Sequence, residues 1–376
     1  KTPNCSQRWK YEKENGRKYY EKGNDVLTNS EKNKKKYRGL VIGCGSIGER
    51  HIHNLQKIGI KDIQAYDMDK KKSKVISEKY KIKSYDDFDS ALESKPDFSI
   101  ICTYPDSHIR IASECVKINS HVFIEKPISG NIEGITRFLK FAKSRKKKVG
   151  IGYNLRFDKG LILLKENLQK NYLGTPLFAS VQWGQNIRFW HNNKNFRDHY
   201  ILKKGNGIIL DDSHEYDYLR WMFNDEIISI FCNTSKSKLI KTETESIAQI
   251  SVKFKKGLIA NLILDYLRPN YERNCHIIGE KGDYKWEFLP QKIQKNYNTS
   301  ANSKLKINYV QNKHTKILNK LVKMNDMYLG ILGNFINSIH NNVEPEVNGW
   351  EGLKTLKIGL AALESSRKNK KINIKY

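Results

Sequence analysis

The sequence predicts an α/β fold: a parallel, doubly wound sheet followed by an α+β domain with an open, mainly antiparallel sheet. Two observations support this expectation. From residue 37 to residue 153, short apolar strands alternate with amphipathic helices, as in a sheet covered on both faces. Beyond Phe157, strands follow one another through Lys-Lys-Gly and Glu-Lys-Gly turns, which is typical of antiparallel hairpins. A length of 376 residues suits two domains.

The elements of the first domain are expected from apolar runs and helical periodicity. Near-continuous apolar runs indicate strands that are buried on both faces of the sheet. The expected strands are 38–42, 63–66, 98–102, 121–124 and 149–153, and the expected helices are 46–58, 70–80, 108–116 and 132–144.

The second domain is expected to contain a meander of strands, because alternating segments are separated by short turns. A meander typically leaves one face of its sheet open. Residues 291–325 are polar and rich in turn formers, so we expect a long loop there. The expected strands are 177–185, 227–233, 246–254, 258–266, 273–279, 283–288 and one near Ile372, and the expected helices are 327–340 and 351–368.

Composition argues against several classes of protein. No run approaches the roughly 18 apolar residues of a membrane span, and the polar N-terminus lacks the apolar core of a secretory signal. The six cysteines show no CxxC pair and no zinc spacing, so we expect neither disulfides nor a metal. The net charge of +28 is spread along the chain without a nucleic-acid-reading motif. We therefore expect a cytoplasmic protein that acts on a small molecule.

A G-x-G-x-x-G turn joins the first strand to the first helix. Gly43 permits the tight turn, Gly45 lets a pyrophosphate approach the backbone, and Gly48 allows close contact between helix and strand. Ser46 and Ile47 open the helix, whose N-terminal N–H groups attract anions. This context predicts a Rossmann dinucleotide-binding domain.

Asp67 ends the second expected strand, where an acidic side chain can bond the adenine ribose hydroxyls. A carboxylate there also repels a 2′-phosphate, so Asp67 predicts NAD in preference to NADP. Lys70 and Lys71 lie nearby and weaken that preference, which leaves NADP as the alternative cofactor.

Two further segments follow strands at the carboxyl edge of this sheet, where a doubly wound fold binds its ligand. Thr103, Pro105 and His108 follow one strand and are expected beside the cofactor, although His108 is also a residue that would simply open the next helix. Glu125 and Lys126 follow the next strand. Burial and the nicotinamide cation are expected to lower the pKa of Lys126, so that it exchanges a proton with a substrate hydroxyl.

A glycine-rich turn at 205–207 leads into a segment that is expected to be one helix. In such a helix Asp211, His214 and Asp217 would lie at i, i+3 and i+6, nearly on one face. A carboxylate beside His214 would orient the ring and keep it a base near neutral pH. The alternative is that Asp211 caps the helix and His214 is a surface residue.

Together these residues resemble the Gfo/Idh/MocA oxidoreductases, the family of glucose-fructose oxidoreductase and inositol dehydrogenase. The resemblance runs from Tyr37 to Tyr376. It implies hydride transfer between nicotinamide C4 and a hydroxyl or keto carbon of a sugar, sugar acid, cyclitol or nucleotide sugar. Its carriers are the glycine turn, Glu125-Lys126-Pro127, Gly152-Tyr153-Asn154 with Arg156-Phe157, the 205–217 segment and the closing helix 352–366.

The resemblance also implies roles for individual residues. Lys126 and His214 would bond the reacting hydroxyl, and His214 would remove its proton while an aspartate orients the ring. Asp211 lies three residues before His214 where many members have four, so either Asp211 or Asp217 could be that partner. The segment that includes Trp190 and Arg197 resembles a subgroup of the family that is associated with bacterial surface-sugar pathways. It supplies further candidate substrate-binding residues. The implied substrate-binding residues are Tyr153, Asn154, Arg156, Trp190, Arg197 and His214.

Domain boundaries follow from the same patterns: a flexible extension at 1–36, the dinucleotide-binding domain at 37–155, and a substrate-binding and oligomerisation domain at 156–376. The resemblance implies a homodimer or homotetramer. Two other functions stay open, an NAD-dependent glycosidase of the same fold and a non-catalytic sugar sensor. Retention of both Lys126 and His214 argues against the sensor, which needs no acid–base pair.

Overall fold

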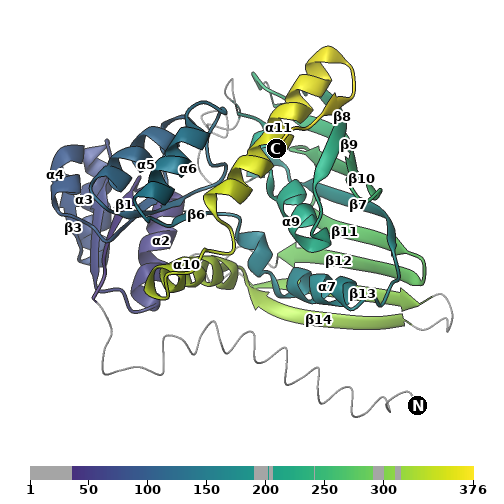
Figure 1. Ribbon diagram of the computed structural model, residues 1–376, viewed down its shortest axis with the longest axis horizontal. Helices are drawn as coiled ribbons and strands as arrows, with labels where there is room; N and C mark the ends of the chain where they lie inside the picture. Colours follow the sequence, from purple (N-terminus) through teal and green to yellow (C-terminus); the bar gives the residue numbers. More distant parts are fainter. Residues whose placement is uncertain (1–35, 190–201, 203–205, 241, 291–299, 310–314) are drawn as a thin grey trace, which may run out of the picture.

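A computed structural model describes residues 36–376 except 190–201, 203–205, 241, 291–299 and 310–314. Two sheets lie side by side, with helices between them and around the first (Figure 1). The described helices include none that is both long enough and apolar enough to cross a lipid bilayer.

The first sheet is parallel throughout, with strand order β3-β2-β1-β4-β5-β6. The order reverses between β1 and β4, which places a ligand-binding crevice at the carboxyl ends of these strands. The short, polar strand β3 and helix α4 were not expected from the sequence; the other predicted elements are confirmed. The strands are β1 Arg38–Ile42, β2 Asp62–Tyr66, β3 Lys83–Tyr85, β4 Phe98–Ile101, β5 His121–Ile124 and β6 Val149–Ile151, and the helices are α2 Ser46–Lys57, α3 Lys70–Tyr80, α4 Phe88–Glu93, α5 His108–Lys117 and α6 Ile135–Ser144.

The end of the chain completes the core of this first sheet. The predicted closing helices are present as α10 (Met324–His340) and α11 (Gly349–Lys368). Phe335 of α10 packs edge-on against Phe98, with ring centroids 6.3 Å apart. Gly150 on β6 leaves room for it, since a Cβ there would lie 2.8 Å from the Phe335 ring. The core of the first sheet is therefore completed by residues that lie more than 170 positions after β6 in the chain.

The second sheet has the order β14-β13-β12-β11-β7-β10-β9-β8-β15. The expected meander is wrong in one respect: β7 lies between β10 and β11, and its pairing with β10 is parallel. Hairpin turns specify the later strands, but no local signal specifies where the first strand is inserted. The strands are β7 Pro176–Gly184, β8 Ile227–Ser235, β9 Ile247–Phe254, β10 Ile259–Asp265, β11 Glu272–Gly279, β12 Gly282–Pro290, β13 Ser300–Tyr309, β14 Thr315–Lys323 and β15 Ile372–Asn373.

The loop expected at 291–325 is also wrong, because β13 and β14 occupy most of that segment. In β13 the buried side chains are small or apolar, and the residues between them are lysines and asparagines. That alternation is the pattern of a half-buried strand, but the polar residues dominate the composition. The buried residues are Ala301, Ser303, Leu305 and Ile307.

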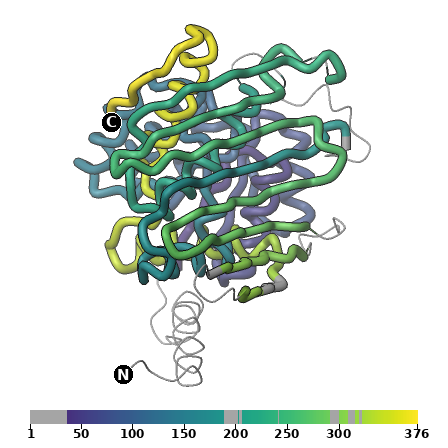
Figure 2. The backbone as a smooth tube through the Cα atoms, turned by 90° about the vertical axis from the view of Figure 1, so that its right-hand side faces the viewer, coloured from purple at the N-terminus to yellow at the C-terminus, as the bar shows by residue number. Residues whose placement is uncertain are grey.

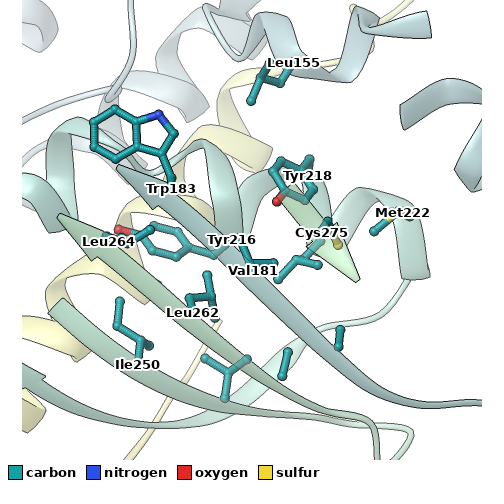
Figure 3. Close-up of a cluster of buried hydrophobic side chains, with 14 of the residues drawn as sticks. Leu155, Val181, Trp183, Tyr216, Tyr218, Met222, Ile250, Leu262, Leu264 and Cys275 are labelled. Carbon is teal, nitrogen blue, oxygen red and sulfur yellow. The ribbon is translucent and has the colours of Figure 1, made fainter. Parts of the chain in front are cut away.

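One face of the second sheet is covered and the other is open. Helices α7 (Lys159–Gln169) and α9 (His214–Phe223) pack on the inner face, where Tyr216 and Tyr218 lie against strand residues such as Val181 and Cys275 (Figure 3). The outer face has no described helix in front of it (Figure 2). The predicted open, mainly antiparallel sheet is therefore confirmed.

Candidate active site

The glycine turn has the geometry that its sequence predicts. Gly43 has φ 96°, and a Cβ on Gly48 would collide with the Gly43 carbonyl oxygen. A Cβ on Gly45 would meet no atom of the described residues within 4 Å, so this side of the turn is open to a ligand. In the described part of the chain, no side chain caps the N-terminus of α2, which begins at Ser46 and includes Ile47. The free N–H groups there suit a pyrophosphate.

Asp67 lies at the end of β2, beside this turn. Its Oδ2 accepts a hydrogen bond from the Cys44 N–H at 2.7 Å, and its Oδ1 accepts one from the Asp69 N–H at 2.8 Å. The carboxylate is thus fixed beside the glycine turn, and its contact with the adenine ribose of a dinucleotide stays a prediction.

The loop after β4 contains Thr103, Pro105 and His108. The Thr103 hydroxyl shares a 2.7 Å hydrogen bond with Ser107, and Pro105 begins a 3-10 turn. The buried His108 ring lies 3.0 Å from both the Thr103 and Pro127 carbonyl oxygens. Both ring nitrogens are occupied by backbone, so the prediction that His108 binds the cofactor is wrong. It opens α5 and ties two loops together.

Lys126 reaches across the crevice to Asp211. Its Nζ contacts the Asp211 carbonyl oxygen and lies 3.1 Å from Asp211 Oδ1. Burial lowers the pKa of Lys126, but Asp211, Asp212 and Glu125 raise it by more. The expected lowering is therefore wrong for the cofactor-free protein, where Lys126 is held as an ammonium ion.

His214 does not lie on a helix with Asp211. Helix α8 (Ile208–Asp211) ends and α9 begins at His214, and the two residues between them break the helical phase. The prediction that Asp211 or Asp217 orients His214 is therefore wrong: Asp211 pairs with Lys126, and Asp217 pairs with Arg156 at 2.7 Å.

The His214 ring is held instead by an edge-on contact with Tyr153, with centroids 5.6 Å apart. Its buried Nδ1 has no hydrogen-bond partner among the described residues. Burial, then the charges of Lys126 and Arg273, lower the pKa of His214 well below its usual value. The imidazole is thus neutral at pH 7, which is the form a general base requires, but the expectation that a carboxylate keeps its pKa near neutral is wrong.

The expected substrate-lining residues before α7 are more buried than predicted. Arg156 is 3% exposed and bonds both Asp217 and Glu351, so its predicted contact with substrate is wrong. Tyr153 and Asn154 are buried too, and the Tyr153 hydroxyl shares a 3.0 Å hydrogen bond with Ser213. Tyr153 thus supports the segment that carries His214, and substrate binding by Tyr153 and Asn154 stays a prediction. Trp190 and Arg197 lie outside the described residues.

A small pocket, with room for about one water molecule, lies between the carboxyl edge of the first sheet and the α8 segment. It is where the loops after β4 and β5 meet the turn that precedes α8, next to the Lys126–Asp211 contact. Its lining residues are Pro105, Pro127, Gly130, Asn206, Leu210 and Asp211.

Two sets of residues at this site were missed in the sequence. The Tyr266 hydroxyl donates to Asp211 Oδ2 at 3.3 Å. The Arg273 guanidinium bonds Asp212 at 2.7 Å and Glu215 at 2.9 Å. Asp212 and Glu215 flank His214, which was the available signal; Arg273 and Tyr266 come from distant strands. The described residues contain no group of His, Cys, Asp or Glu arranged to hold a metal ion.

Comparison with known proteins assigns the family. Residues 37–153 match the NAD-binding Rossmann-fold domain of the Gfo/Idh/MocA oxidoreductases, and residues 165–374 match the C-terminal α/β domain of that family. The chain belongs to the Gfo/Idh/MocA oxidoreductase family. It is an NAD-dependent oxidoreductase, as the sequence predicted.

Relatives of this Gfo/Idh/MocA member include enzymes that are named as inositol dehydrogenases. It is 25% identical over 354 residues to myo-inositol 2-dehydrogenase of Thermotoga maritima, covering 89% of this chain and 97% of that protein. It is 24% identical to an inositol 2-dehydrogenase/D-chiro-inositol 3-dehydrogenase of Halalkalibacterium halodurans, covering 88% and 91%.

Solved structures share the fold. Levoglucosan dehydrogenase in complex with NADH aligns with TM-score 0.78 at 14% identity, over 91% of this chain and 100% of that one. An Agrobacterium radiobacter oxidoreductase in complex with NAD+, L-tartaric acid and magnesium aligns with TM-score 0.77 at 17% identity, over 90% and 98%.

Proposed function

We propose that this oxidoreductase transfers a hydride between NAD and a secondary CH–OH carbon of a cyclitol or sugar, with Lys126 and His214 as its acid–base pair. The observation that carries the proposal is the Lys126–Asp211 contact. It brings the lysine of the cofactor domain to the segment that also presents His214, beside the pocket.

The glycine turn and Asp67 would hold the dinucleotide, with Thr103 and Pro105 along its edge. When bound, NAD supplies the hydride acceptor. In oxidation, neutral His214 takes the hydroxyl proton, while the Lys126 ammonium donates a hydrogen bond to the same oxygen as negative charge develops. Reduction reverses these proton movements. A positioned base of this kind contributes roughly 10²–10⁴-fold in rate.

The names of the relatives make cyclitols the first candidate substrates, followed by sugars, sugar acids and nucleotide sugars. The test is a screen for NADH absorbance with myo-inositol, levoglucosan, tartrate and representative nucleotide sugars. Absence of an absorbance change in both directions would reject the proposal. Release of an aglycone from a glycoside without NADH accumulation would indicate the glycosidase instead.

The position of Asp67 supports NAD over NADP. Calorimetry should show NADH binding more tightly than NADPH, and Asp67→Ser should weaken NADH about tenfold by removing charge-assisted hydrogen bonds. Equal or tighter NADPH binding by the unaltered protein would reject this preference.

The open face of the second sheet is proposed to join copies of the chain into a homodimer or homotetramer. It presents large exposed apolar side chains, and such a patch marks a surface that binds a partner. These side chains are Ile228, Phe231, Ile259, Ile263 and Ile278. Light scattering at micromolar concentration should show an oligomer that Ile263→Lys dissociates, while Leu239→Lys, at an exposed residue outside this sheet, leaves it intact. A strict monomer would contradict the proposed self-association.

The described cysteines are free, in keeping with a reducing compartment such as the cytoplasm.

A further inference from the structure

A buried histidine on the cofactor helix contacts the loop that carries Lys126. His51 lies on α2, just beyond the glycine turn, and is 0% exposed. Its Nε2 lies 2.7 Å from Glu125 Oε1. The other oxygen of Glu125 accepts a 3.2 Å hydrogen bond from the Lys126 backbone N–H. A continuous path thus runs from α2 to the backbone of Lys126.

Packing fixes both members of this pair. The His51 ring meets Phe123 edge-on at 5.4 Å and Tyr328 of α10 at 6.4 Å. Beside Glu125, Gly152 has no side chain, and a Cβ there would lie 2.7 Å from Glu125 Oε2. The two ring contacts thus hold the His51 ring beside Glu125, and Gly152 leaves the room that the Glu125 carboxylate occupies.

The charge on Glu125 depends on its surroundings. Burial raises the pKa of Glu125, but the hydrogen bond and charge of His51, together with Lys126, lower it by more. The titratable groups that face it are His51 from α2, Cys102 after β4, His108 from α5, and Lys126 beside it.

We propose that His51 is a positioning residue for hydride transfer: through its hydrogen bond to Glu125 it fixes the backbone that presents Lys126 to the crevice. The inference rests on the proposed role of Lys126. Because α2 begins at the dinucleotide turn, His51 also connects the cofactor helix to the proton-transfer site.

The test uses three variants of the full chain. His51→Leu removes the hydrogen bond, and His51→Gln restores a donor at the place of Nε2. Asn54→Ala is the matched control: Asn54 lies one turn further along α2, is equally buried, and bonds Asn325 of α10 at 2.6 Å without touching Glu125.

The first measurement is hydrogen exchange of the Lys126 backbone amide in the absence of cofactor. We expect faster exchange in His51→Leu, and exchange close to that of the unaltered protein in His51→Gln and Asn54→Ala. Unchanged exchange in His51→Leu would overturn the inference.

The second measurement is kcat/KM against pH on a polyol that the unaltered protein oxidises. His51→Leu should lose about 10- to 100-fold, since small misplacements of a reacting group have effects of this size. Its loss should deepen as pH falls, because removing His51 takes away the largest influence that lowers the pKa of Glu125, so the carboxylate accepts a proton at higher pH than in the unaltered protein. His51→Gln should recover most of the activity, and Asn54→Ala should lower Tm without changing the pH profile.

A pH profile in His51→Leu identical to that of the unaltered protein would also overturn the inference. If the unaltered protein oxidises no polyol, the proposed function fails, and the exchange measurement alone decides whether His51 fixes Lys126.

Discussion

The two walls of the crevice are built in different ways. On the cofactor side, most features come from local sequence: the glycine turn, and side chains at the ends of strands. On the opposite side, the residues around His214 are tied to partners far along the chain, through Lys126–Asp211, Arg273–Asp212 and Arg156–Asp217. A short motif can therefore specify the first wall, whereas only the folded chain specifies the second.

The largest effect should come from the residues that meet between the two walls. Lys126→Ala and His214→Ala should each lower kcat by roughly 10²–10⁴-fold, because each removes a proton-transfer or hydrogen-bonding group. Calorimetry should show NADH affinity almost unchanged in both. Near-full turnover by His214→Ala would show that another group is the base.

On the cofactor wall, a larger side chain in the glycine turn should weaken cofactor binding by steric exclusion. Gly45→Val fills the open side of the turn and should weaken NADH binding about 100-fold, judged from the usual free energy of overpacking. The control is Gly333→Ala on α10, where an added Cβ also meets no described atom within 4 Å; this variant should bind NADH normally. Tight binding by Gly45→Val would place the pyrophosphate elsewhere.

On the opposite wall, loss of a charged group should lower activity. Asp211→Asn removes the carboxylate that raises the pKa of Lys126, so the ammonium form should be lost at lower pH than in the unaltered protein. We expect kcat to fall about tenfold and its alkaline limb to move to lower pH. If the alkaline limb of kcat does not shift, Asp211 does not control the protonation of Lys126 in catalysis.

The smallest effect concerns stability. Burial raises the pKa of Glu351, but Arg220 and Arg156 outweigh it and hold the pKa at about 2. A depressed carboxyl pKa stabilises the fold above its unfolded value, and this contribution is lost as pH falls from about 4.3 towards 2.

Glu351→Gln should therefore lower the free energy of unfolding by about 2 kcal/mol at pH 7 and flatten its acid dependence, as measured by urea titration. The control is Glu364→Gln on the same helix, whose partner Lys368 is at the surface. It should change stability far less than Glu351→Gln does, because solvent screens a surface ion pair. Equal effects of the two substitutions would remove the distinction between buried and surface pairs.

The same contrast explains what could be predicted from the sequence. The parallel sheet, the glycine turn and the positions of Lys126 and His214 carry strong local signals. The partner of His214 was mistaken because two non-helical residues before it change the direction in which Asp211 points. Arg156 was mistaken for a substrate ligand because the carboxylates that neutralise it lie 61 and 195 residues away. The β13–β14 hairpin was missed because its outward lysines hid the alternation.

The packing of α10 on the first sheet has a consequence for biosynthesis. Phe98 and Phe123 lie in the first third of the chain, yet Phe335 covers them. During translation, part of the apolar surface of the nucleotide-binding half therefore stays exposed to solvent until the last helices leave the ribosome. We expect that half to need chaperone protection in the interval and to aggregate when expressed as a fragment that ends before α10.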